Sequence, residues 1–174
     1  MNNEKTLAFV KITEKPVEDF FKRLFLSDIK PLNLIIVTPI MGSLVSTRYS
    51  LERLREKIES EKIVTYVVTR KPEERFHIEA LDILMKSDFV EIRYNNSLHA
   101  KLYICMGKDI GFALLGSGNL TQTSIERNIE IGMLILHRGR GKQILHELYH
   151  WGGVRLRTLK ESKVVKRITY ARRV

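Results

Sequence analysis

Hydrophobic and polar positions along the chain follow two different periods. Residues 32–37 form an almost uninterrupted apolar run, which is typical of a strand buried on both faces. Residues 17–25 carry apolar side chains three and four apart, which predicts an amphipathic helix. The same reading predicts strands at residues 6–12, 32–37, 63–68, 89–94, 100–105, 110–115 and 129–136. It predicts helices near residues 16–25, 50–60 and 72–84, and a last helix with Ile144, Leu145, Leu148 and Trp151 on its buried side.

Strands that alternate with helices predict an α/β fold, a single domain whose mixed β-sheet is flanked by helices on both faces. Only short turns separate the strands at 89–94, 100–105 and 110–115, so we expect these three to be antiparallel. The length of 174 residues suits one such domain. We divide the chain into a main body, residues 1–153, and a C-terminal segment, residues 154–174, packed on the same domain.

Composition narrows the class of protein. Cys105 is the one cysteine, which excludes an intramolecular disulfide and a cluster of metal-binding thiolates. The longest apolar stretch, residues 32–41, is too short to span a bilayer, and the first ten residues lack the pattern of a secretory signal. We therefore expect a cytoplasmic protein without a membrane partner.

Positive charge is concentrated at the C-terminus. The chain has 30 Lys and Arg against 20 Asp and Glu, a net charge of +10. Residues 154–174 contain eight basic residues and one acid, which is +7 of that total. This asymmetry indicates a polyanionic partner, and nucleic acid is the one we favour. The candidate nucleic-acid-binding residues are Arg155, Arg157, Lys160, Lys163, Lys166 and Arg167.

Two short motifs carry the candidate chemistry. His99 and Lys101 stand two residues apart at the start of a predicted strand, and Ser117 and Asn119 stand two apart at the end of the next strand. If these strands pair as a hairpin, an imidazole, an ammonium, a hydroxyl and a carboxamide meet in one neighbourhood. Taken singly, each is more often a surface or turn residue. Together they suit a phosphate group, because Lys and Asn can hold its oxygens while His attacks phosphorus or moves protons.

These motifs resemble the signature of the phospholipase D superfamily, which is His-x-Lys followed by Gly-Ser-x-Asn. Here the two elements are residues 99–101 and residues 116–119. The branch that the chain is most similar to has a single motif and includes nucleases and restriction-type enzymes. In that branch an acid follows the Asn by eleven positions, where this chain has Glu130. The fuller family signature has an Asp seven residues after the His; Met106 at that position argues against a phospholipase-like member.

The resemblance implies a phospholipase D-like fold and a mechanism without metal or cofactor. His99 would attack a phosphodiester and form a phosphohistidine, while Lys101 and Asn119 stabilise the charge on phosphorus. Ser117 would assist by hydrogen bonding, and Glu130 would accept a hydrogen bond from His99. The chemistry needs two histidines and the chain has one motif, so the resemblance implies a homodimer with the site at its two-fold axis.

The leading interpretation is a DNA endonuclease. One alternative is a phospholipid phosphodiesterase, since the superfamily includes lipid-processing enzymes. The other is a nucleic-acid-binding module that keeps the fold and no longer cuts. The intact catalytic set argues against the second alternative, because a binding module gains little from it.

Overall fold

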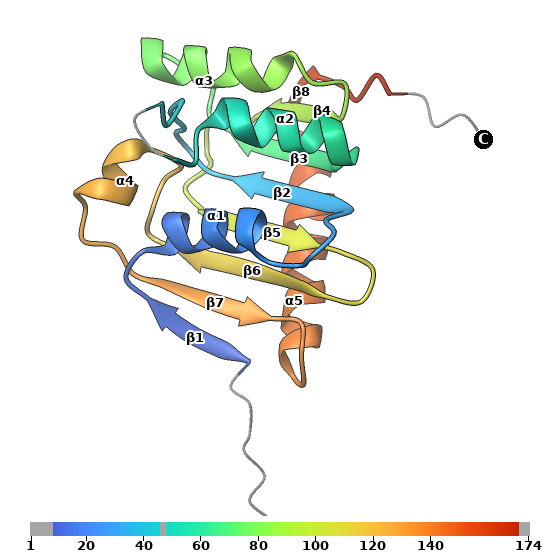
Figure 1. Ribbon diagram of the computed structural model, residues 1–174. Coiled ribbons are helices and arrows are strands. Elements are labelled where there is room, and N and C mark those ends of the chain that lie inside the picture. The colour runs from blue at the N-terminus through green and yellow to red at the C-terminus, as the bar shows by residue number, and fades with distance from the viewer. Residues whose placement is uncertain (1–8, 46–47, 171–174) are drawn as a thin grey trace, which may run out of the picture.

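The computed structural model describes residues 9–45 and 48–170, and its centre is an eight-stranded mixed sheet (Figure 1). The strand order is β1-β7-β6-β5-β2-β3-β4-β8. The strands are β1 Val10–Thr13, β2 Asn33–Val37, β3 Val64–Thr69, β4 Val90–Tyr94, β5 Leu102–Met106, β6 Gly111–Gly116, β7 Gly132–Leu136 and β8 Lys163–Lys166. The helices are α1 Pro16–Leu26, α2 Leu51–Glu61, α3 Arg75–Met85, α4 Gln122–Glu126, α5 Gly141–His150, the π-helical turn η1 Trp151–Arg155 and α6 Leu156–Thr158.

The sheet combines a parallel half and an antiparallel half. β2, β3 and β4 are parallel and are connected through α2 and α3, as the long crossovers of parallel strands require. β5, β6, β7 and β1 are antiparallel to their neighbours, and β2 joins the halves by pairing antiparallel with β5. β8 pairs antiparallel with β4 and is the outermost strand on that side of the sheet.

Helices cover the two faces of the sheet separately. α1, α2 and α3 lie on one face (Figure 1), where Phe20 of α1 packs against Tyr103 and Phe112 of the sheet and against Phe21 of its own helix. α5 and η1 lie on the other face, where Leu145 is fully buried. η1 approaches the sheet closely because Gly153 has no side chain: a Cβ there would stand 2.7 Å from the side chain of Ile35.

The antiparallel half brings three loop segments together at one end of its strands, which we call the site edge of the sheet. Leu102 pairs with Leu115, so the residues before β5 lie beside those after β6. Gly116 pairs with Gly132, so the residues before β7 join them. This edge is on the left in Figure 1, next to α4, and β2 ends there too.

The predicted architecture is confirmed, and the errors are local. β4 runs antiparallel to β5, as expected, but does not pair with it: β3 and β2 lie between them, because a short loop returns the chain across two strands. Helix α3 begins at Arg75 rather than at residue 72. Ile144, expected on the buried side of α5, is 37% exposed, because Leu145 faces the sheet. β1 covers residues 10–13; residues 6–8 of the predicted strand lie outside the described residues.

Candidate active site

The β5–β6 hairpin brings the two motifs together. His99 and Lys101 precede β5, and Ser117 and Asn119 follow β6, at the same end of the hairpin. The amide of Gly116 donates to the carbonyl of Lys101 at 3.3 Å, which extends the pairing to the motif residues. The strand begins at Leu102, two residues later than predicted, so His99 and Lys101 lie in the entering loop rather than on a strand face. There the Lys101 ammonium donates to the carbonyl of His99 at 2.9 Å.

Glu130 joins this group from the segment before β7. The Ser117 hydroxyl donates to one oxygen of the Glu130 carboxylate, and the Asn128 amide donates to the other at 3.0 Å. The backbone supports the contact, because the amide of Ser117 donates to the carbonyl of Ile131 at 3.0 Å. Glu130 is buried although it is charged, and hydrogen bonds to both carboxylate oxygens offset the cost of that burial.

Asn119 holds an unused hydrogen-bonding group. Its side-chain oxygen Oδ1 is buried and has no hydrogen-bond partner among the residues that the structure describes. Buried polar atoms without a partner are rare, because each costs about 1–3 kcal/mol, and they occur at functional sites. Nearby, the buried hydroxyl of Tyr103 donates to the carbonyl of Gly118 at 2.8 Å and so fixes the turn that carries Asn119.

His99 is exposed, and its imidazole has no hydrogen-bond partner within residues 9–45 and 48–170. The expected hydrogen bond between Glu130 and His99 is therefore not formed in the single chain. In this structure the Glu130 carboxylate accepts from Ser117 and Asn128 instead, and the contact with His99 stays a prediction for the assembled site. The structure thus brings all five predicted residues to one edge and leaves the imidazole open to the surface.

The basic C-terminal residues divide into two kinds. Arg157 is committed within the chain: it donates to Glu91 at 2.8 and 2.9 Å and stacks 3.5 Å above the ring of Tyr66. Arg93 donates to the same Glu91 carboxylate. Burial alone would raise the pKa of Glu91, but the hydrogen bonds and charges of the two arginines outweigh it and hold that pKa below its usual range. These contacts hold the Arg157 guanidinium within the chain, so we no longer count it among the candidate nucleic-acid-binding residues. Of the other candidates, Arg155, Lys160, Lys163 and Arg167 are exposed and Lys166 is partly exposed.

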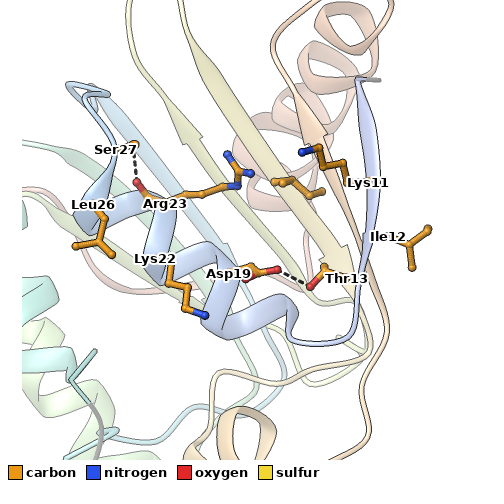
Figure 2. Close-up of a pocket in the computed structure, with 9 residues that line it drawn as sticks. Lys11, Ile12, Thr13, Asp19, Lys22, Arg23, Leu26 and Ser27 are labelled. Atoms are coloured by element: carbon orange, nitrogen blue, oxygen red, sulfur yellow. Dashed lines mark hydrogen bonds between the residues drawn. The ribbon is translucent and has the colours of Figure 1, made fainter. Parts of the chain in front are cut away.

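A hollow of about 360 Å³ lies between β1 and α1, and none of the five site residues lines it (Figure 2). Lys11 of β1 and Arg23 of α1 line this hollow. The hydroxyl of Thr13 donates to the carboxylate of Asp19. Over the described ranges 9–45 and 48–170, no three His, Cys, Asp or Glu side chains gather as a metal ion would require. Within the same ranges no helix is long and apolar enough to cross a membrane.

Comparison with known proteins identifies the architecture. No family model matches the chain, and no curated protein matches it in sequence. Its structure is similar to that of Nuc from Salmonella typhimurium, a phospholipase D family member, with a TM-score of 0.59 over 91% of this chain and 98% of that one, at 12% identity. The chain has the phospholipase D fold.

Other solved structures share this fold. NucT from Helicobacter pylori aligns with a TM-score of 0.55 over 89% of this chain and 96% of that one, at 12% identity. Polyphosphate kinase from Porphyromonas gingivalis aligns with a TM-score of 0.59 at 14% identity over 91% of this chain, which spans 27% of that protein. The predicted phospholipase D-like fold is therefore confirmed, and the motif residues lie at one edge of that fold.

Two residues with clear positions at the site had no predicted role. Asn128 bonds Glu130 and stands two residues before it, so the Asn-x-Glu spacing was a usable signal. Tyr103 stands two residues after Lys101, but its bond to the turn at Gly118 depends on the hairpin register, which the spacing does not contain.

Proposed function

We propose that this protein is a phosphodiesterase that cleaves nucleic acid, most readily DNA, without a metal ion. The observation that supports this most directly is the convergence of His99, Lys101, Ser117, Asn119 and Glu130 at one edge of the sheet. Each is a side chain that phosphoryl transfer through histidine would use. The fold shared with Nuc and NucT is compatible with this chemistry but does not identify the substrate.

The proposed reaction has two steps at one phosphorus atom. An imidazole nitrogen of His99 attacks phosphorus, an N–P bond forms and the P–O bond to the leaving group breaks. A second, protonated histidine gives its proton to the leaving oxygen. That histidine then takes a proton from water, which attacks phosphorus and breaks the N–P bond, so both histidines return to their starting forms. Lys101 and Asn119 hold the phosphoryl oxygens, where negative charge builds up.

The second histidine comes, in this proposal, from a second copy of the chain. His99 is exposed and its ring has no partner among the described residues, which suits a position at an isologous two-fold interface. There each His99 would lie next to its counterpart. Glu130, which is held by Ser117 within its own chain, would lie at the rim of the shared site.

An exposed apolar patch beside the site supports this interface. Ile129 and Ile131 flank Glu130, and both are exposed. Met133 of β7 pairs with Ile12 of the neighbouring strand β1, and both of these side chains are exposed as well. Four large apolar side chains next to a charged site are costly to leave in water, and covering them would favour association of two chains.

The polyanionic substrate is inferred from charge. The exposed Arg155, Lys160, Lys163 and Arg167 of the C-terminal segment, with the partly exposed Lys166, would bind phosphates without reading the base sequence. Lys163 begins β8 at the same end of the strands as the site, because it pairs with Tyr94, the last residue of β4. A phospholipid phosphodiesterase remains the alternative enzyme, and a binding module the alternative without chemistry.

One assay separates these functions. Purified protein and its His99→Ala variant are incubated in excess EDTA with single- and double-stranded DNA, RNA and phospholipid vesicles. We expect DNA cleavage by the wild type that survives EDTA and is absent in the variant. Cleavage that requires added magnesium, or turnover of the phospholipid alone, would overturn the proposal. Salt-sensitive binding without turnover of any substrate would instead support the binding module.

A further inference from the structure

A second polar hollow lies at the same sheet edge as the candidate active site. It measures about 350 Å³ and begins where β2 and β3 end. Its polar lining is supplied by Arg70, Lys71, Glu73, Glu74, His77 and Asn96. None of these residues was assigned a role by the motif pattern, and the proposed chemistry does not use them.

Arg70 connects this hollow to the active-site loop. Its Nε donates to the carbonyl of Leu98 at 2.7 Å, and Leu98 directly precedes His99 in the chain. Its backbone amide donates to the carbonyl of Pro39 at 3.3 Å, which fixes the base of the side chain. In the described part of the chain Arg70 forms no ion pair, so the terminal nitrogens of a partly buried guanidinium are free for a ligand. An arginine in this state suits a phosphate group.

The remaining walls determine what else the hollow accepts. The backbone of Lys71 donates to the side chain of Asn96 at 3.0 Å, while its exposed ammonium has no carboxylate partner among the described residues. Glu73 and Glu74 are exposed carboxylates on the same hollow. His77 is buried beside Thr69, at 3.0 Å from its hydroxyl, and burial lowers its pKa. Two cations and two carboxylates around one hollow fit a ligand that has both an anionic group and hydrogen-bond donors.

A nucleotide has both features, since its phosphate is anionic and its base carries donors such as the amino group of cytosine. We propose that this hollow is a subsite for the nucleotide next to the scissile phosphodiester, in a single strand of nucleic acid. Arg70 and Lys71 bind the next phosphate along that strand, which a dinucleotide lacks, and Glu73 and Glu74 face the base between the two phosphates. The proposal rests on the nuclease function proposed above and adds a substrate position to it.

The subsite also links the active site to the basic segment. The side chain of Asn95, next to Asn96, donates to the hydroxyl of Ser162 at 3.0 Å, and Ser162 is followed by the exposed Lys163. A single strand of nucleic acid that is cleaved at His99 and bound by Arg70 would therefore continue toward β8 of the protein.

The test compares a short and a long substrate. Arg70→Gln and Lys71→Gln proteins, and a matched Lys108→Gln control, are assayed on a dinucleotide and a hexanucleotide, each as DNA and as RNA. Lys108 is an exposed lysine in the β5–β6 turn, at the opposite end of the hairpin. We expect the ratio of kcat/KM for the hexanucleotide to that for the dinucleotide to fall about fivefold or more in each subsite variant, and not in the control. Comparison of this fall between the DNA and the RNA substrates shows which of the two nucleic acids the subsite binds.

Binding of the labelled hexanucleotide is measured in parallel over a range of salt concentrations. Each lost phosphate contact should lower the slope of log Kd against log salt by about 0.7. Equal losses on both substrates, or an equal loss in the Lys108 control, would overturn the subsite, because the effect would then be structural or merely one of net charge. Wild-type protein that cuts neither substrate would refute the nuclease function, whereas the binding measurement would still decide the subsite.

Discussion

The Ser117 hydroxyl donates a hydrogen bond to the carboxylate of Glu130 and so joins the end of β6 to the segment before β7. Thirteen residues separate the two in sequence. The bond ties a motif residue to the one buried acid among the five site residues.

Replacing Ser117 by alanine should weaken catalysis and leave the fold intact. We expect kcat to fall about 10- to 100-fold, which is about 1.4 to 2.7 kcal/mol on the activation barrier, because the Glu130 carboxylate loses one of the two side-chain donors that fix it at the site. The effects of Ser117→Ala and Glu130→Gln should be less than additive in the double variant, because both remove the same contact. A Ser60→Ala variant, which changes an exposed hydroxyl on α2, serves as the control. Fully additive effects on kcat would show that the two residues act independently.

Asn119 should contribute to activity without contributing to stability. In an Asn119→Ala variant we expect kcat to fall about 10²- to 10³-fold, because a group that stabilises charge on phosphorus is lost. The variant also removes a buried oxygen that has no partner in the described structure, so thermal unfolding should occur at the same or a higher temperature. A marked fall in Tm with activity retained would mean that Asn119 is a structural residue.

Association of two chains should depend on the patch beside Glu130. A Met133→Glu variant places a charge among apolar side chains and should yield a monomer without cleavage activity. Ile110→Glu, at an exposed position at the other end of β6, is the matched control and should remain dimeric and active. Sedimentation velocity combined with a cleavage assay measures both properties. A Met133→Glu monomer with full activity would contradict the shared site.

The Glu91 ion pairs should stabilise the fold in a pH-dependent manner. The pKa of Glu91 is lower in the folded chain than its ordinary value of 4.5, so its contribution is complete above about pH 4.5 and is lost as the pH falls through the folded-state pKa. Glu91→Gln should lower the free energy of unfolding by about 2 kcal/mol at pH 7. The difference from the wild type should shrink toward zero well below pH 4. Urea titrations at several pH values measure it, and a constant difference at all pH values would contradict this account.

The sequence predicts the layers of the fold better than its connections. Buried runs such as residues 32–37 and the stripe on α1 indicate their elements directly, because burial imposes a period on the residues. The place of β4 beside β3 and β8, rather than beside β5, follows from pairing across distant segments, which no local pattern contains.

The same limit applies to the candidate site. Spacing predicts that His99, Lys101, Ser117 and Asn119 meet, because a hairpin with short turns has few possible registers. It does not predict that Glu130 bonds Ser117 instead of His99, or that Arg70 reaches the carbonyl of Leu98 across 28 residues. The commitment of Arg157 to Glu91 was likewise hidden, since a basic run looks the same whether its members bind a partner or the chain itself.

Detection of the covalent intermediate tests the central claim most directly. A DNA strand with radioactive phosphorus at one internal phosphodiester is mixed with the protein in EDTA and quenched in alkaline denaturant, which preserves phosphohistidine. We predict that the label migrates with the protein and maps to the peptide that contains His99, and that His99→Ala protein carries none. Cleavage of the strand with no label on the protein, or label on a residue other than His99, would contradict the account.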